Sequence, residues 1–344
     1  MRSLMHRSAL ASFVVVLLIA AAPRLRADGC TTQSELAVPV RDGIASAALG
    51  LAQKVQNGAM QQVRAQTIPQ YANDFSGIET AVNTASPHLL GLQLSVESVW
   101  LLDATNLKAA ADGTAQDGQF FCTLNRSAAQ VNFLIPSLPA GRYAFALVDA
   151  PSTNGAGWQL AFVLQEIAGA WRLAGFFPRA TAAAGHDGLW YWRGAREFVA
   201  KKEAMNSWIY FQQAATLLRP VSFLSSNHLD RLNDETSRAA PSALSQGISN
   251  EAPLALRGVN GSDVRITAIG TDDSLKTQPI DLALHFKAEG VLEPTQARAR
   301  NREVAAAFVK AYPEVASVFH GVWVFAEVPN AAPFGSEHPM SNLR

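Results

Sequence analysis

The chain has 344 residues, with 28 basic and 28 acidic side chains, and 49% of its residues are hydrophobic. This composition excludes a disordered protein and is ample for a packed core, which we expect to be divided between at least two domains. Lys and Arg form no cluster along the chain, so its charge gives no reason to expect binding to nucleic acid or to an anionic membrane surface.

Residues 1–27 have the pattern of a cleavable export signal. Arg2 and Arg7 precede an uncharged apolar run from Ala9 to Ala22, and Ala27 places a small residue at the expected cleavage point. The run is shorter than the roughly 20 residues that cross a bilayer, which favours cleavage over anchoring. The mature chain is therefore predicted to be exported, to the periplasm or the medium.

The two cysteines, Cys30 and Cys122, have three possible states in an exported protein. An even pair in an oxidising compartment favours one disulfide, which would close a loop of about 90 residues. Cys30 could instead carry a lipid, because it follows the signal closely, although Asp28 is unusual two residues before a lipidated cysteine. Free thiols are the third state, and membrane contact is expected only if Cys30 is lipidated.

The first half of the mature chain predicts an α+β domain over residues 28–185. Apolar residues at spacings of three and four predict a helix from Asp42 to Gln66, and Asp74 is expected to cap a second helix that runs to Thr84. Alternating apolar residues, with one slip near Val96, then predict antiparallel strands from Leu90 to Phe177. The expected segments are 92–101, 120–122, 131–135, 143–148, 158–167 and 171–177.

This order, two helices and then strands, resembles the NTF2-like superfamily, as does the closing hairpin with its segment Trp171 to Phe176. The resemblance implies a curved sheet wrapped around the helices as a cone, with a ligand cavity between the first two helices and the sheet. Its nearest candidate lining residues are Tyr71, Asp74, Trp100 and Asp103. The segment Leu138 to Tyr143 also resembles the turn before a strand in small β-sandwich modules. The whole chain further resembles secreted bacterial proteins, a likeness that implies no function.

Residues 186–232 predict a pair of helices. Small and aromatic residues recur there at the spacing of a tetratricopeptide hairpin, which the segment resembles: Tyr191, Gly194, Ala195, Phe198, Ser207, Phe211, Ala214 and Pro220. Because stacked repeats need about three copies to bury a core, a single hairpin is interpreted as a bridge packed on a neighbouring domain. Trp190, Trp192 and Trp208 are expected to pack between this bridge and the first domain.

The remaining chain predicts a polar linker over residues 233–257 and a second α+β unit over 258–330. Two strands, at 264–269 and 280–286, precede a helix from Pro294 to Phe319, which Pro313 must kink or divide, and a last strand at 322–328. We expect this unit to fold apart from the rest, with residues 331–344 as a loose tail.

Familiar catalytic signatures are absent from the sequence, including the serine elbow, the zinc helix, the phosphate loop and the Cys-x-x-Cys motif. The weak catalytic candidates are His186 as a general base and Asp187 as its orienting carboxylate, beside an aromatic wall that includes Trp190. In the alternative that we favour, Asp187 caps the following helix and the tryptophans pack. No cofactor or metal ion is predicted.

The other polar pairs predict structural roles. His228 and Asp230 suit the start of a short helix, and Asp272 with Asp273 suits a turn, because calcium needs more oxygen ligands than this pair supplies. His285 and His320 are interpreted as hydrogen-bonded structural histidines.

Three functional hypotheses remain open on the sequence. The leading one is an exported, non-enzymatic binding or interaction protein of the cell envelope, whose partner is a protein or a small apolar or aromatic ligand. The alternatives are a small-molecule enzyme that uses the NTF2-like cavity, and a lipid-anchored envelope assembly factor.

Overall fold

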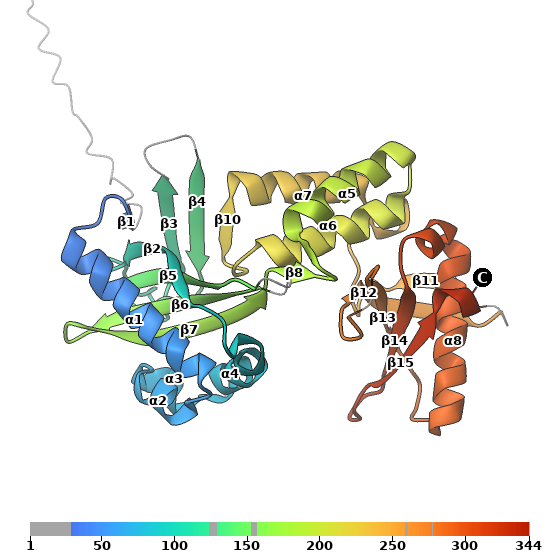
Figure 1. Ribbon diagram of the computed structural model, residues 1–344, viewed down its shortest axis with the longest axis horizontal. Coiled ribbons are helices and arrows are strands. Elements are labelled where there is room, and N and C mark those ends of the chain that lie inside the picture. Colours follow the sequence, from blue (N-terminus) through green and yellow to red (C-terminus); the bar gives the residue numbers. More distant parts are fainter. Residues whose placement is uncertain (1–28, 124–128, 153–156, 259–260, 277, 344) are drawn as a thin grey trace, which may run out of the picture.

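The computed structural model describes residues 29–123, 129–152, 157–258, 261–276 and 278–343, so the predicted cleavage site after Ala27 lies outside the described residues. The fold is α+β, as predicted. Figure 1 shows an N-terminal lobe, a C-terminal lobe and a layer of helices, α5 to α7, that connects them. None of the described helices combines the length and the apolar character needed to span a membrane.

Four helices open the N-terminal lobe: α1 (Val38–Gln56), α2 (Met60–Ala65), α3 (Pro69–Asn73) and α4 (Ser76–Leu89). The long helix predicted to end at Gln66 is therefore divided after Gln56, where Gly58 takes a positive φ of 61° that a helix does not allow. The predicted cap Asp74 lies before α4 and makes no cap to its backbone, and α4 continues past Pro87 to bury Leu89.

A five-stranded antiparallel sheet lies beside these helices, in the order β1-β2-β5-β6-β7. Its strands are β1 (Gly29–Thr32), β2 (Ser95–Asp103), β5 (Arg142–Ala150), β6 (Trp158–Ile167) and β7 (Ala170–Ala180). The slip predicted near Val96 is confirmed as an irregularity in the β2–β5 register between Val96 and Ser98.

A second sheet covers the opposite face of the first. It consists of β3 (Gly118–Thr123), β4 (Gln130–Ile135) and β10 (Leu224–Ser226) in the order β10-β4-β3. Strand β5 is consequently buried on both sides: Ala144 and Ala146 pack towards the helices, whereas Tyr143 and Phe145 pack towards the second sheet. The strands that we expected in one curved sheet are thus divided between two stacked sheets.

The predicted disulfide is confirmed. Cys30 of β1 and Cys122 of β3 are bonded, with their Cα atoms 5.3 Å apart and a sequence separation of 92 residues. The bond joins an edge of the first sheet to an edge of the second. It uses the sulfur atom of Cys30 that a lipid would need, so the structure favours the disulfide over the lipid anchor.

The predicted pair of helices is also confirmed, as α5 (Gly188–Lys201) and α6 (Ala204–Leu218), preceded by the short strands β8 (Ala182–Ala183) and β9 (His186–Asp187). A methyl group added at Gly188 would lie 2.5 Å from the Leu218 side chain, and one at Gly194 would lie 3.0 Å from the Tyr210 ring. Small residues therefore permit the close approach of α5 and α6. A third helix, α7 (Asn227–Ala239), packs on α6.

The C-terminal lobe is a five-stranded mixed sheet with one long helix, α8 (Pro294–Ala311). The strands follow chain order: β11 (Leu254–Arg257), β12 (Asp263–Asp272), β13 (Asp281–Lys287), β14 (Gly321–Glu327) and β15 (Phe334–Pro339). Only the β13–β14 pair is parallel, and α8 forms its crossover. As expected, the helix is divided before Pro313, where a short 3-10 helix (Pro313–Ser317) follows.

Two expectations about this lobe are corrected. The segment predicted as a linker contains the end of α7, a 3-10 turn and strand β11, and the segment predicted as a loose tail forms β15. Strand β15 is held by its pairing with β14 and by the burial of Ser336 and His338. Because Ser336 and His338 are polar, their burial in a strand was not expected. Ser336 Oγ hydrogen-bonds to His338 Nε2 and accepts a hydrogen bond from Asn301 of α8, which compensates for their burial.

The helical layer and the C-terminal lobe share one hydrophobic core. Tyr210 of α6 contacts Phe319 with ring centroids 6.0 Å apart, and Asn206 of α6 donates a hydrogen bond to the Glu314 carbonyl. Trp192 and Trp208 are buried in this shared core and not against the first domain, whereas Trp190 is 37% exposed. The C-terminal lobe therefore does not have the separate core that we expected.

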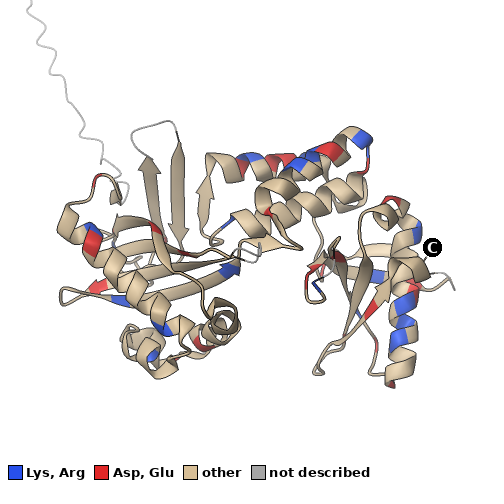
Figure 2. Ribbon diagram, in the orientation of Figure 1, with Lys and Arg blue, Asp and Glu red and all other residues tan. Residues whose placement is uncertain are grey.

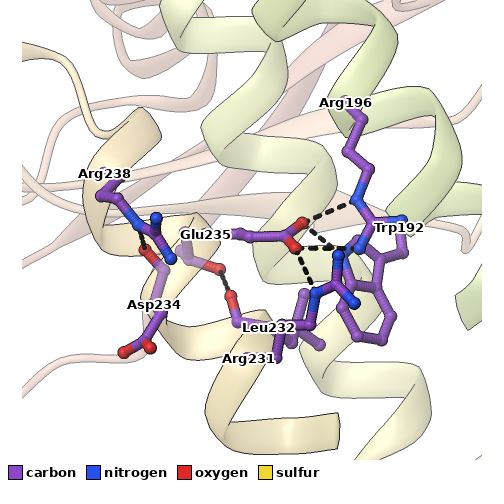
Figure 3. Close-up of polar contacts among 8 residues, drawn as sticks. Trp192, Arg196, Arg231, Leu232, Asp234, Glu235 and Arg238 are labelled. Carbon is purple, nitrogen blue, oxygen red and sulfur yellow. Dashed lines mark hydrogen bonds and ion pairs between the residues drawn. The ribbon is translucent and has the colours of Figure 1, made fainter.

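Helices α5 and α7 carry both acidic and basic residues (Figure 2), and Glu235 of α7 binds side chains of α5, as Figure 3 shows. Its two carboxylate oxygens accept hydrogen bonds from Arg196 at 2.7 and 2.9 Å, from Trp192 Nε1 at 2.8 Å and from Arg231 at 2.9 Å. These donors, Arg196 above all, lower the pKa of the Glu235 carboxyl to about 2. The carboxylate therefore stays ionised at any pH near neutrality.

We expect Glu235→Gln to lower the free energy of unfolding by about 1 kcal/mol at pH 7, the upper value for a partly exposed ion pair. Because the folded pKa is depressed, the stabilisation is complete above the unfolded value of 4.5 and is lost as the pH falls from there towards 2. Urea unfolding of both proteins from pH 7 to pH 3 would measure this. An equal difference between them at every pH would contradict the role assigned to the charge.

Candidate ligand-binding site

The main candidate site is a cavity of about 300 Å³ between the two stacked sheets of the N-terminal lobe. Apolar and aromatic side chains dominate its lining, with three other polar residues, Gln70, Ser137 and Gln165, among them. The lining residues are Ile68, Gln70, Tyr71, Ile135, Pro136, Ser137, Leu138, Pro139, Tyr143, Val163, Gln165, Ala174, Phe177 and Phe223.

The edge strand β7 positions one wall of this cavity. The chain after α2 runs beside β7, where Leu173 N donates to the Gln66 carbonyl at 2.8 Å and Ile68 N donates to the Leu173 carbonyl at 2.9 Å. Helix α3 starts directly afterwards and contributes Tyr71, which is 40% exposed, to the lining of the cavity. The opposite wall is the turn after β4, which Tyr143 holds by donating a hydrogen bond to the Pro139 carbonyl at 2.9 Å.

The Tyr143 hydroxyl is a neutral hydrogen-bonding group in this cavity. Burial, and to a smaller extent the neighbouring Tyr71, raise the pKa of Tyr143 to about 12. None of the described lining residues is Asp, Glu, His, Lys or Arg. The site can enclose a ring and offer hydroxyl and amide hydrogen bonds.

Of the four pocket residues predicted from the sequence, the structure places one in this cavity, namely Tyr71. Asp74 is exposed and accepts a hydrogen bond from Ser76, and Asp103 accepts two from Thr105 in the turn after β2. Trp100 is buried between the sheets against Phe133 and Phe145. The cavity also lies on the opposite face of the sheet from the one expected, because α1 and α4 fill the helical face with their own core.

His186 and Asp187, the catalytic candidates, do not form an acid–base pair. Asp187 Oδ1 accepts a hydrogen bond from Trp190 N at 2.8 Å and so caps α5, as the structural alternative predicted. The His186 ring stacks on Trp190 with centroids 3.7 Å apart. The two side chains thus serve the start of the helix.

The remaining predicted pairs have structural positions. Ser226 caps α7 through Leu229 N, which places His228 and Asp230 in its first turn. Asp272 accepts a hydrogen bond from Ser274 N at 2.9 Å, and Asp273 pairs with Lys276, in the predicted turn. His285 binds Glu327 and His320 binds Asp281, in each case through Nδ1.

A second cavity, of about 450 Å³, lies between the lobes and was not foreseen from the sequence. His88 and Trp158, which stack at 4.8 Å, line it from the N-terminal lobe, and Asp273 and Lys276 line it from the C-terminal lobe. Arg179 lines both this cavity and a neighbouring one of about 590 Å³. No sequence pattern could have predicted that these residues lie together, because they come from strands and loops that are far apart in the chain.

Arg179 belongs to a partly buried polar cluster at the end of the first sheet, in which Gln159 is the buried member. It donates to Gln159 Oε1 at 2.7 Å and to the Leu217 carbonyl, and Gln159 donates to Glu97 and Asp149 at 2.9 Å each. Burial lowers the pKa of Arg179 to about 10, and burial together with Asp149 raises the pKa of Glu97. Since Arg179 binds the last turn of α6, this cluster ties the helical layer to the first sheet.

No protein-family model matches the chain, and no curated protein or solved structure shows detectable similarity to it. The resemblances to NTF2-like proteins and to the tetratricopeptide hairpin therefore stay predictions. The chemistry of the cavities is the remaining indication of function.

Proposed function

We propose that this protein is an exported binding protein that holds a small apolar or aromatic ligand between its two N-terminal sheets. The observation that carries the proposal is the cavity of about 300 Å³ lined by Tyr71, Tyr143, Phe177 and Phe223. Its volume lies at the lower end of the usual range for small-molecule sites, about 300 to 1,000 Å³, and suits a single ring system.

Two features of the cavity lining support a role in ligand binding and not in catalysis. The polar groups, which include Gln70, Ser137 and Gln165, can orient a ligand through hydrogen bonds, while the aromatic faces supply apolar contact. The absence of His and carboxylate side chains from the lining weighs against the alternative of an enzyme in this cavity.

The disulfide supports the exported location, because bonds of this kind persist in oxidising compartments. It also weighs against the third hypothesis, the lipid-anchored assembly factor, since Cys30 Sγ is already bonded to Cys122. Passage through an export pathway remains part of the proposal.

The test is titration with 2-naphthol, a fluorescent aromatic alcohol, followed by emission and calorimetry. We expect saturable binding at one site per chain, weakened at least tenfold in Tyr71→Ala. Ala174→Leu, which fills the cavity without removing an aromatic contact, should weaken binding to a similar extent. Phe121→Ala is the matched control, because Phe121 is a 51% exposed aromatic residue on β3 that does not line the cavity.

The two cavity variants separate specific binding from surface adsorption. Native mass spectrometry of the protein purified from its own cells should in addition detect a bound small molecule that Ala174→Leu no longer retains. Equal 2-naphthol binding by the wild type, Tyr71→Ala and Ala174→Leu would overturn the proposal.

A further inference from the structure

The topology of the C-terminal sheet brings three potential metal ligands to one edge. Strands β13 and β14 are parallel, so both start at this edge, and the antiparallel β15 ends there. Asp281 is the first residue of β13, His320 directly precedes β14, and Glu337 lies near the end of β15. They are separated by 39 and 17 residues in the chain, so no short motif reveals them.

The three side chains converge. His320 Nδ1 lies 2.9 Å from Asp281 Oδ1, and one ligand atom from each residue lies within 4.8 Å of the other two. Asp281 is fully buried, whereas the His320 side chain is 41% exposed. The cluster is therefore buried at Asp281 and accessible to water at His320.

Glu337 supplies a second observation, independent of the convergence. Its Oε1 atom is buried and has no hydrogen-bond partner in the described structure. A methyl group added at Gly321 would overlap this oxygen and would lie 3.2 Å from Asp281 Oδ1. The glycine thus leaves room for two carboxylates to approach each other, an arrangement that is costly unless a cation lies between them.

We infer that Asp281, His320 and Glu337 form a binding site for a divalent transition-metal ion of the zinc type. One imidazole and two carboxylates are a suitable donor set for zinc, with bonds of about 2.0 to 2.2 Å that place neighbouring ligand atoms roughly 3.4 Å apart. The Asp281 and His320 atoms, 2.9 Å apart, are already close to that spacing, and the Glu337 ligand atom lies within 4.8 Å of both. Calcium is disfavoured, because it takes six to eight oxygen ligands.

The open side of His320 leaves a coordination position for water or for a ligand from solution. Three protein ligands with one open position are typical of zinc sites that bind exchangeable ligands, whereas structural zinc sites have four protein ligands. The site needs no thiolate, so it is compatible with the oxidising compartment that the disulfide indicates.

The same sheet contains a matched control for this site. His285 Nδ1 lies 2.8 Å from Glu327 Oε1, and these two residues belong to the same strands, β13 and β14. Among the described residues, no third potential ligand completes a metal-binding group with this pair. Both pairs combine a partly exposed histidine with a carboxylate. A specific site should therefore respond to changes at His320 and not to changes at His285.

The experiment uses the full mature chain, purified without a polyhistidine tag and stripped with a chelator. Zn²⁺ is titrated by calorimetry, bound metal is counted by mass spectrometry after desalting, and Co²⁺ is added as a spectroscopic probe. We expect one Zn²⁺ per chain, a rise in Tm with Zn²⁺ concentration, and visible Co²⁺ bands that Zn²⁺ abolishes. Glu337→Gln and His320→Gln should each weaken Zn²⁺ binding about 100-fold.

Two further variants make the result decisive. Gly321→Ala keeps all three ligands but displaces Glu337, so it should weaken Zn²⁺ binding as well, while His285→Gln should bind like the wild type. Circular dichroism without metal shows which variants fold. If His320→Gln does not fold, Glu337→Gln is the decisive variant, because Glu337 is partly exposed. The inference is overturned if the wild type retains no stoichiometric metal, or if Glu337→Gln binds Zn²⁺ as tightly as the wild type.

Discussion

Replacing both cysteines, as Cys30→Ser with Cys122→Ala, should lower the free energy of unfolding by roughly 4 to 5 kcal/mol. The bond closes a loop of 92 residues, and its loss returns the corresponding conformational freedom to the unfolded chain. It also frees β1, a strand of only four residues at the sheet edge, from β3. Guanidinium unfolding of the variant and the wild type would measure the difference.

The wild type treated with a reductant is the control for this prediction. It should match the double variant in its unfolding midpoint and should release two thiols to alkylation. A double variant as stable as the oxidised wild type would mean that the bond does not restrain the unfolded chain in this way.

Trp208→Ala should cost about 3 to 5 kcal/mol, as expected for removal of a large buried side chain. Trp208 lies on α6 and is only 5% exposed, within the core that the helical layer shares with the C-terminal lobe. The loss should therefore destabilise both parts together. Calorimetry would record a lower Tm and one common transition for α6 and the C-terminal sheet.

Trp190→Ala is the matched control, because Trp190 belongs to the neighbouring helix and is 37% exposed. It should cost much less than Trp208→Ala. If the C-terminal sheet keeps its wild-type midpoint in Trp208→Ala, the two parts do not share a cooperative core. If Tm is unchanged but binding of a ligand is lost, Trp208 contacts a ligand and not the core.

The sequence predicted best those elements that short-range patterns specify. Strand β6 has the predicted bounds, Trp158–Ile167, because it contains a continuous apolar run from Leu160 to Leu164 and because Ala168 and Gly169 both take the positive φ angles of a tight hairpin turn. The two helices α5 and α6 were foreseen from small residues at helical spacing, and Gly188 and Gly194 do lie at their contact. In these cases, residues close together in the sequence are sufficient to predict the element.

The cavity that we expected between the first two helices and the sheet is not the candidate site, which lies on the opposite face of the sheet. Tyr71 was singled out and lines the cavity, but Trp100, which was expected there, fills the core between the sheets. Tyr143, Phe177 and Phe223 were not foreseen as pocket residues. An aromatic residue on a strand shows the same alternation whether it lines a cavity or packs against another side chain, so only the stacking of the sheets decides its role.

Local sequence patterns alone predicted the α+β class and most of the helices and strands, because these depend on periodicity and turns. The even number of cysteines favoured a disulfide over a lipid anchor or free thiols, and the structure contains that bond. Tertiary structure decided how the strands are divided between two sheets, that residues 334–339 form β15, and that Asp281, His320 and Glu337 meet at one edge. The physical reason is that strand pairing and side-chain convergence join residues far apart in the chain. Their free energy depends on burial and hydrogen bonding, which a local pattern does not contain.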